Sequence, residues 1–428
     1  MNNKINSPDI RRKQKEYLMP CVANYYKEPL VLTHGEGKYV YDAEGNQYLD
    51  FFCGILTTML GHSHPEVNRR TKEQIDKLQH TSTLYQTAPM VELAEKMAEI
   101  TPGKLKKSFF TNSGTEADET AIMIAKKFTG CDEVLVLRHS YSGRSSLAMS
   151  MTGNYAWRQP GASIPGVKHA LSPYCYRCPL HLKYPDCGVA CAQDIEELIL
   201  TSTSGKVACF LAEPIQGVGG FITPPPEYFQ VAVPIIRKYG GVFISDEVQT
   251  GFGRTGDKMF GIEHYGVEPE IMTMAKGVAN GLPMGAMLAR EDVAAAFGPG
   301  THASTFGGNP VASAAAVATM KIMLADGFLA EVGAKGAYLA SKLAEVASRH
   351  PYLASGVRGL GLIQALVLTE AAVPHGSAMI NALFKEGLLL NFAGNVALRF
   401  IPPLVVSRAE IDEMIAILDR VLTARPWQ

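Results

Sequence analysis

The chain lacks a surplus of charge of either sign. Among its 428 residues, 40 lysines and arginines stand against 41 aspartates and glutamates, so the formal net charge is −1. A dedicated nucleic-acid binder carries a strongly basic surface, which this balance does not provide. Long apolar runs are missing as well, because about the longest, residues 311–320, stops at Lys321 and falls short of the roughly 18 residues that span a membrane. We therefore expect neither a nucleic acid nor a membrane as a partner.

Cysteine is scarce, and eight residues in the whole chain are too few for a disulfide scaffold. The first 20 residues, MNNKINSPDIRRKQKEYLMP, contain neither the apolar core nor the small-residue cleavage site of a secretory signal. Five basic residues there imitate an organelle-targeting peptide, but Asp9 and Glu16 argue against that interpretation. We expect a cytoplasmic protein.

Apolar residues are abundant, at 47% of the chain, and 40 glycines and 25 prolines supply many turns. From about residue 65 to 320, short apolar runs alternate with helical segments. The runs lie at residues 108–111, 133–137, 209–212, 242–245 and 271–274. Strands that are apolar throughout and separated by helices predict a mostly parallel sheet with both faces covered, which is the α/β class.

The pattern changes near Met320. The segments that follow predict a long helix, a strand at GLIQALVLT, another helix and a strand at ALRFIPPL, which is typical of a smaller α+β domain. We expect a large domain at residues 65–320 and a small C-terminal domain at residues 321–428. Within residues 1–64, KYVYDAEGNQYLDFF predicts two short strands joined by a turn. The pattern alone does not decide where this segment packs, and we assign it to the small domain.

The first segment that suggests chemistry is FFTNSGTEADETAIMIAKKFTG, residues 109–130. An apolar strand ends at Thr111, and a glycine-containing turn leads into a helix in which Ser113 and Glu116 have capping-box spacing. Three acidic residues suit the positive end of this helix: Glu116, Asp118 and Glu119. A helix start of this kind offers free N–H groups and a hydroxyl to a phosphate. The plainer interpretation is that Ser113 only caps the helix.

Two other segments place a charged side chain at the end of a buried strand. Asp246 follows the run 242–245, where a carboxylate is costly unless it is paired or functional. Lys276 follows apolar residues and precedes a glycine-rich loop, where desolvation would lower the pKa of its amine and make it a nucleophile. An isolated lysine there would more often be exposed. The string GFGRTG matches a dinucleotide motif, but it does not directly follow a strand and no good helix follows it.

A phosphate-binding helix start, a carboxylate for a pyridinium nitrogen and a lysine for a Schiff base are together what a pyridoxal phosphate site requires. Five segments, in this order, resemble motifs of the class III aminotransferases of the type I pyridoxal-phosphate fold: NSGTEA, AEPIQG, DEVQTGFGRTG, MAKG and THASTFGGNP. The resemblance extends from about Leu30 to Leu404. It implies that fold, an aminotransferase activity and pyridoxal 5′-phosphate as cofactor.

The resemblance also implies roles for single residues. Lys276 would form the Schiff base and shuttle a proton, and Asp246 would pair with the pyridine nitrogen. The phosphate and the ring would be contacted by Ser113, Gly114, Thr115, Tyr141, Val248 and Gln249. Thr305 matches a threonine that the family contributes to the phosphate of the neighbouring subunit, which implies a homodimer or a dimer of dimers. Ser142 stands where the family often has a histidine, so any contact made by that histidine is absent.

Two arginines bear on the substrate. Arg399 matches the arginine that many members use bidentately on the α-carboxylate. Arg144 matches a second arginine that ω-amino-acid members use for the distal carboxylate. Val218 stands where ornithine and 4-aminobutyrate aminotransferases carry a glutamate that switches the first arginine off, which casts doubt on those substrates. Glu213 would support the site rather than react.

Segments such as LQHTSTLYQTAPM look closest to the alanine–glyoxylate aminotransferase 2 branch. This implies ping-pong transfer from a small amino acid or ω-amino acid, such as alanine or β-alanine, to a 2-oxo acid such as glyoxylate or pyruvate. A 4-aminobutyrate-type or amine transaminase using 2-oxoglutarate or pyruvate stays open, as does a same-fold phospho-lyase, aminomutase or decarboxylase. A regulatory protein is disfavoured, because the first 30 residues leave no room for a helix-turn-helix.

Four cysteines form an unexpected C-x2-C-x8-C-x3-C pattern: Cys175, Cys178, Cys187 and Cys191. Their number and pairing suit a structural zinc ion. The loop between the pairs is shorter than in common zinc ribbons, and catalysis by this fold needs no metal. We therefore assign no metal, and both zinc binding and free thiols stay open.

Overall fold

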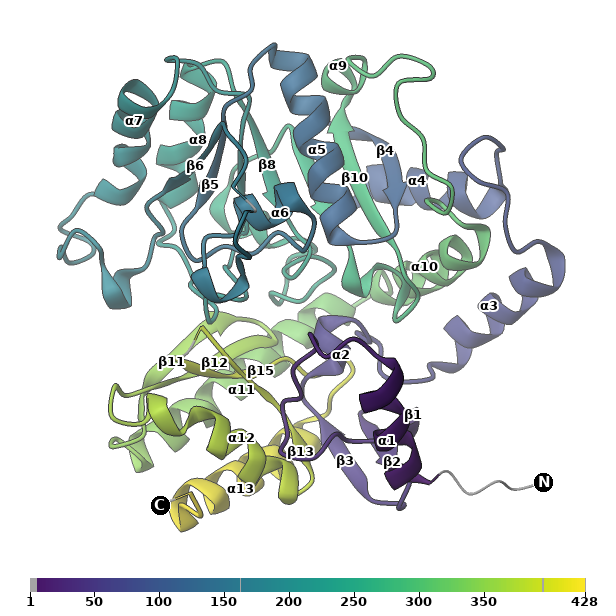
Figure 1. The fold of residues 1–428 in the computed structure, drawn as a ribbon, viewed down its shortest axis with the longest axis vertical. Helices are drawn as coiled ribbons and strands as arrows, with labels where there is room; N and C mark the ends of the chain where they lie inside the picture. The colour runs from purple at the N-terminus through teal and green to yellow at the C-terminus, as the bar shows by residue number, and fades with distance from the viewer. Residues whose placement is uncertain (1–5, 162, 395, 428) are drawn as a thin grey trace.

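The computed structural model describes residues 6–161, 163–394 and 396–427, and Figure 1 shows two lobes, one above the other. The upper lobe is built on a seven-stranded sheet. Its strands lie in the order β4 (Leu105–Thr111), β10 (Gly285–Arg290), β9 (Ile271–Met274), β8 (Val242–Asp246), β7 (Cys209–Ala212), β5 (Val134–Leu137) and β6 (Val167–Ala170). Strand β10 runs antiparallel to both β4 and β9, and the pairs from β9 to β6 are parallel.

Helices cover both faces of this sheet because its strands are apolar on both sides. Successive side chains of a strand point to opposite faces, so Val134 and Val136 join a core with α5 (Gly114–Thr129). Leu135 and Leu137 join a second core with α7 (Ala190–Ser202) and α8 (Tyr228–Lys238). The α/β class predicted from continuous apolar runs is confirmed.

The lower lobe contains two four-stranded sheets. One is antiparallel, in the order β11 (Ala354–Leu360), β12 (Ile363–Leu368), β15 (Ala397–Phe400) and β14 (Asn391–Ala393). The other has the order β1 (Leu32–Glu36), β2 (Tyr39–Asp42), β3 (Gln47–Asp50) and β13 (Leu388–Leu389). Leu49 pairs with Leu388 in parallel, so the strands of the N-terminal segment share a sheet with a C-terminal strand, as the purple and yellow-green ribbons in Figure 1 show.

Helix α10 (Pro310–Met323) leads from the upper lobe to the lower one and packs against α3 (Pro65–Lys77) and α4 (Ala88–Ile100). Residue 321, where we expected the small domain to begin, lies inside α10. The long helix expected after it is α11 (Phe328–Arg349), and Gly327 at φ +80° marks the break between the two. No single described helix is long and apolar enough to cross a membrane; α10 and α11 reach that length and composition only as a pair bent by 74°.

The other described helices are short or lie at the periphery. They are α1 (Ser7–Tyr17), α2 (Cys53–Leu56), α6 (Ser146–Met151), α9 (Glu291–Ala294), α12 (Gly376–Lys385) and α13 (Arg408–Ala424), with 3₁₀ turns η1 (Tyr155–Trp157), η2 (Cys175–Arg177), η3 (Gly261–Tyr265), η4 (Lys276–Ala279) and η5 (Val373–His375). Among these, η4 begins at Lys276, two residues after the end of β9, and packs on α10, which fixes the position of the Lys276 backbone.

Candidate active site

A cavity of about 290 Å³ lies at the edge of the large sheet where the parallel strands end. Tyr141, Glu213, Asp246 and Lys276 come at or after the ends of β5, β7, β8 and β9, and residues 113–115 follow β4. Carboxyl ends of parallel strands meet at one edge of a sheet, and this is where α/β proteins bind ligands. The strand order therefore brings five distant segments of the chain around one cavity.

The start of α5 forms one wall of this cavity. Ser113 Oγ accepts the N–H of Glu116 at 3.2 Å, so the predicted cap is present. The carboxylate of Glu116 accepts the N–H of Asn112 at 3.0 Å rather than that of Ser113, so the predicted capping box is shifted by one residue. No described residue accepts the N–H of Gly114 or Thr115. Free N–H groups at the positive end of a helix suit a phosphate.

The loop after β5 closes over this helix start. A Cβ atom on Gly143, whose φ is +132°, would lie 1.9 Å from Thr115 Oγ1, so only glycine allows this approach. Tyr141 lines the cavity, and its N–H donates to Glu213 Oε1 at 3.2 Å. Glu213 Oε2 accepts the N–H of Gly217 at 2.8 Å. Burial, helped by the charge of Asp246, raises the pKa of Glu213 to about 8. Glu213 thus ties two loops together, as expected for a supporting residue.

Asp246 and Lys276 face the same cavity from neighbouring strands. Asp246 is 3% exposed, and its Oδ1 accepts the N–H of Val248 at 3.0 Å. Burial raises the pKa of Asp246 to about 6, so this carboxylate is ionised at neutral pH. Burial also lowers the pKa of Lys276 although Asp246 opposes the shift, which favours the nucleophilic amine. The backbone of Lys276 has φ +48°, a strained conformation of the kind found at active sites.

The other cavity wall carries Gln249, whose Oε1 accepts from Arg399 Nη2 at 3.1 Å. Arg399 is 3% exposed, and its guanidinium lies over the ring of Phe221 at 4.4 Å. Its Nε has no hydrogen-bond partner, and no described carboxylate lies within 4.0 Å of its guanidinium. Burial lowers the pKa of Arg399 to about 10, so it stays charged. A buried positive charge without a counter-charge is costly unless a ligand supplies one.

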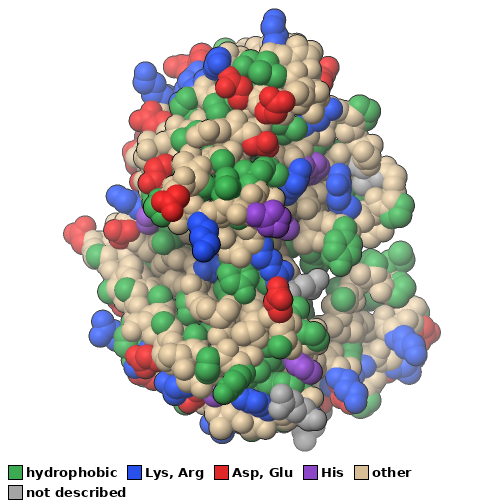
Figure 2. Space-filling view, turned by 90° about the vertical axis from the view of Figure 1, so that its left-hand side faces the viewer, with side chains coloured by type: hydrophobic (Ala, Val, Ile, Leu, Met, Phe, Trp, Pro, Cys, Tyr) green, Lys and Arg blue, Asp and Glu red, His purple; other side chains and the backbone are tan. Residues whose placement is uncertain are grey.

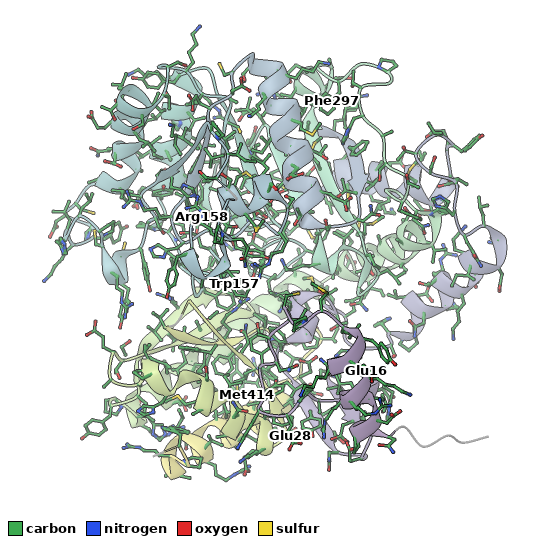
Figure 3. The ribbon with its side chains drawn as sticks, viewed as in Figure 1. Glu16, Glu28, Trp157, Arg158, Phe297 and Met414 are labelled. Carbon is green, nitrogen blue, oxygen red and sulfur yellow. The ribbon has the colours of Figure 1, made fainter. Side chains whose placement is uncertain are left out.

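Three predicted residues are not part of the cavity lining: Arg399, which contacts the lining residue Gln249, and Arg144 and Thr305, which lie farther out. Arg144 is exposed, stacks on Trp157 at 4.5 Å and donates from Nη1 to the Trp157 carbonyl at 3.3 Å. Trp157 lies at the lower edge of the upper lobe (Figure 3). Thr305 is exposed as well, next to Phe306, which is 61% exposed. Figure 2 shows basic side chains gathered at mid-height on one side of the molecule, beside a hollow between the lobes. Within one subunit, therefore, neither Arg144 nor Thr305 joins the residues that line the cavity.

Comparison with known proteins agrees with this geometry. The family model described as "Aminotransferase class-III" matches residues 21–422. The chain belongs to the class III aminotransferases. These enzymes use pyridoxal phosphate on the type I fold, so the predicted fold, enzyme class and cofactor are confirmed. Such an enzyme takes an amino donor and a 2-oxo acid as substrates.

The relatives differ in their named substrates. The acetylornithine aminotransferase of Caldanaerobacter subterraneus subsp. tengcongensis is 40% identical over 417 residues, covering 96% of this chain and 98% of that one. Alanine–glyoxylate aminotransferase 2 homolog 2 of Arabidopsis thaliana is 36% identical over 419 residues, covering 96% and 86%. The crystal structure of an (S)-enantioselective ω-transaminase from Thermomicrobium roseum superposes with a TM-score of 0.90 at 33% identity, covering 98% and 99%.

Among the titratable residues of this aminotransferase site, one was missed. Asp118 lines the cavity and is 1% exposed, whereas the sequence pattern placed it with Glu116 and Glu119 as a complement to the helix charge. That interpretation was wrong for Asp118, because a residue four positions after Gly114 lies on the same helix face as Gly114. The spacing was the signal that would have found it. Glu247, next to Asp246, turns away and accepts the N–H groups of Gly261 and Ile262.

The four cysteines of the C-x2-C-x8-C-x3-C pattern line another, small cavity of about 20 Å³. All four are free thiols, and Cys175 is exposed. Burial raises the pKa of Cys191 to about 12, so this thiol stays protonated. Across the described parts of the chain, no group of three or more His, Cys, Asp or Glu side chains is placed to hold a metal ion.

Proposed function

We propose that this aminotransferase moves an amino group from a small amino acid or ω-amino acid, of the alanine or β-alanine type, to glyoxylate or pyruvate by a ping-pong mechanism. The observation that supports it is the buried guanidinium of Arg399, which has no carboxylate within 4.0 Å among the described residues and bonds to a residue of the cavity wall. A substrate α-carboxylate would supply the missing charge through a bidentate contact. Val218, in place of a glutamate, leaves Arg399 available in both half-reactions.

The residues around the cavity fit the cofactor. Free N–H groups at residues 114 and 115 and the glycine at 143, where a Cβ would fill the cradle, suit its phosphate. When bound, pyridoxal phosphate supplies an aldehyde carbon that takes up the amino group and a ring that draws electrons from the substrate. Asp246 would hold a proton on the ring nitrogen, and Gln249 would reach the ring oxygen. Tyr141 and Val248 would cover the two ring faces.

Lys276 would perform the proton transfers. Its Nζ faces the cavity in a buried setting that favours the neutral amine, so it can bind the cofactor in the resting enzyme. Once displaced by the donor, the same nitrogen would move a proton between the substrate carbon and the cofactor aldehyde carbon. Arg399 would orient the carboxylate so that the scissile C–H bond faces Lys276.

The position of Arg144 favours small donors. Its stacking on Trp157 holds the guanidinium at the surface, so binding a distal carboxylate would require it to leave that contact. Alanine, glyoxylate and pyruvate carry a single carboxylate next to the reacting carbon, so they need only Arg399. This supports the alanine-type pair over substrates with two carboxylates.

An acetylornithine-type reaction is the second candidate, and the relative of 40% identity favours it. A donor and acceptor panel separates the two. We expect faster turnover of alanine or β-alanine with glyoxylate or pyruvate than of N-acetylornithine with 2-oxoglutarate, and the reverse ranking would support the second candidate. Carbon dioxide or phosphate released in step with donor loss would instead indicate a decarboxylase or phospho-lyase.

We further propose that the enzyme works as a homodimer in which Thr305 of one subunit contacts the phosphate bound by the other. Thr305 lies beside an exposed apolar patch in two adjacent segments, with Leu84 78%, Tyr85 67% and Phe306 61% exposed. The two segments are joined by the Thr83 N–H, which donates to the Ser304 carbonyl at 3.3 Å. A second copy covering this patch would bury it. Sedimentation equilibrium should give twice the chain mass, and Phe306→Asp should shift the protein to monomer.

A further inference from the structure

Asp118 is held directly beside Asp246. Thr273 pairs in register with Asp246 across β8 and β9, and its Oγ1 donates to Asp118 Oδ1 at 2.7 Å. The three side chains are 1%, 3% and 0% exposed for Asp118, Asp246 and Thr273. Asp118 therefore reaches from α5 onto the strand pair that carries the carboxylate of the cofactor site. Nothing in the proposed mechanism uses it.

Asp118, Asp246, Glu213 and Lys276 form one corner of the cavity, and the charges in this corner do not balance if every acid is ionised. Three carboxyl groups face the cavity, from Asp118, Asp246 and Glu213, and Lys276 is the basic residue that lines it with them. Asp246 accepts a backbone N–H and Glu213 accepts two, whereas Asp118 accepts a single hydroxyl. Like charges at one buried site force protons onto the members whose charged form is less stabilised.

Glu213, whose raised pKa of about 8 keeps it protonated at neutral pH, is one such member, and Asp118 is the other. Burial, followed by the charge of Asp246, raises the pKa of Asp118 well above its ordinary value, and Glu213 adds to the shift. Thr273 and Lys276 oppose it without reversing it. Lys276 and the Val248 N–H both favour the charged form of Asp246, and its pKa of about 6 keeps that charge at neutral pH.

We propose that Asp118 is a positioning residue: it carries a proton and, as a neutral hydrogen-bonding group, keeps the negative charge of this corner on Asp246. This rests on the proposed role of Asp246 opposite the ring nitrogen. A second negative charge at Asp118 would draw a proton onto Asp246 and remove the charge that pairs with the ring. The protonated group accepts from Thr273 and keeps one O–H to donate within the cavity.

Infrared spectroscopy of the cofactor-free protein tests the protonation directly. The difference spectrum between wild type and Asp118→Asn at pH 7.5 should contain the C=O band of a protonated carboxylic acid. Glu119→Gln is the matched control, because Glu119 is the next residue on α5 and bonds to Ser145 away from this corner. That variant should leave the band in place. Absence of the band from the difference spectrum, or its loss in Glu119→Gln, would overturn the proposal.

The holoenzyme tests the consequence for Asp246. The absorbance of bound pyridoxal phosphate, followed from pH 6 to 9, should keep its wild-type profile in Asp118→Asn, which is neutral and hydrogen-bonding. In Asp118→Ala the profile should shift, and the apparent affinity for pyridoxal phosphate should fall roughly tenfold, as the loss of about one buried hydrogen bond predicts. Equal shifts in both variants, or none in Asp118→Ala, would contradict the proposal. Failure of the aminotransferase assignment would leave the infrared result unchanged, so the two failures are distinguishable.

Discussion

Buried carboxylates at the two edges of the large sheet differ in whether a basic side chain contacts them. At the carboxyl edge, Asp246 has no described basic group within 4.0 Å. At the amino edge, Glu270 is 5% exposed, forms ion pairs with Arg237 at 2.8 Å and Arg290 at 3.3 Å, and accepts the N–H of Phe243 at 2.9 Å. The described chain therefore neutralises Glu270 with its own arginines and leaves Asp246 without a cation in contact. An internal charge without such a partner indicates a ligand site, whereas a neutralised one indicates a structural role.

The largest effect should come from the lysine at the carboxyl edge. Lys276→Ala removes the nucleophile and the proton carrier together, so transamination should fall by about a thousandfold or more. Purified wild type should be yellow, and borohydride should fix the cofactor covalently at Lys276. Lys258→Ala, which changes an exposed lysine, is the control. Labelling at another lysine would refute the assignment.

The second effect concerns stability at the amino edge. Glu270→Gln leaves Arg237 and Arg290 without their shared carboxylate, and both arginines are partly exposed, with side chains 43% and 33% accessible. Solvent screening reduces the full cost of breaking a buried pair to about 2 kcal/mol in the free energy of unfolding. Asp292→Asn, which removes only the exposed partner of Arg290, should cost no more than about 0.5 kcal/mol. Turnover should not change in either variant.

At the carboxyl edge, removing the charge of a buried carboxylate should raise the free energy of unfolding instead of lowering it. Asp246 has its pKa raised to about 6 in the folded protein from an ordinary 3.8, so the folded state loses stability as pH rises from about 4 to 6. In the cofactor-free protein, Asp246→Asn should therefore raise the free energy of unfolding above pH 6, by up to about 2–3 kcal/mol. Urea unfolding at pH 5 and pH 7.5 checks this, because the gain should shrink at the lower pH. A loss of stability at pH 7.5 would remove the contrast with Glu270.

The contrast extends to Arg399, a cation without an acidic partner. Arg399→Ala removes a charge-assisted bidentate contact worth about 1.5–3 kcal/mol, so kcat/KM for amino acids should fall roughly ten- to a hundredfold. An amine donor without a carboxylate is the internal control and should be little affected. An equal loss with both donors would mean that Arg399 acts through Gln249 on the cofactor rather than on the substrate.

The smallest effect should follow from giving Arg399 a partner. Val218→Glu should lower alanine turnover several-fold by pairing with Arg399. It should spare or improve β-alanine turnover, because Arg144 would hold the distal carboxylate of that donor. Val218 is half-buried in the loop that follows Glu213. The ratio of alanine to β-alanine turnover is the measurement. Equal losses would mean that residue 218 does not face Arg399.

Much of this site was predictable because its reactive side chains lie at or just after the ends of buried strands. Asp246 and Lys276 were found from apolar runs, and the structure ends β8 at Asp246 and places Lys276 two residues after β9. The cap at Ser113 was likewise readable from local spacing. These features depend on residues close in sequence, so the pattern of a few neighbours determines them.

Features that depend on tertiary contacts were not predictable. The apolar strand β10 (Gly285–Arg290) follows a glycine-rich loop that hid its start, and its antiparallel direction depends on pairing with β4 and β9. Asp118 resembled a surface acid because its partner, Thr273, lies 155 residues away. The direction of Arg144 depends on Trp157, which no periodicity connects to it.

The stack of Arg144 on Trp157 has a consequence for redesign of the enzyme. Tyr141 meets Trp157 edge to face, with ring centroids 5.8 Å apart, so a row of three side chains leads from the cavity lining to the surface. None of the three belongs to either core of the sheet. Libraries at residues 144 and 157 should therefore alter which donors enter while thermal stability changes little, since surface substitutions usually shift it by about 0.5 kcal/mol or less. Broadening the substrate range through Asp118 or Glu213 would instead disturb buried polar contacts on which the fold depends.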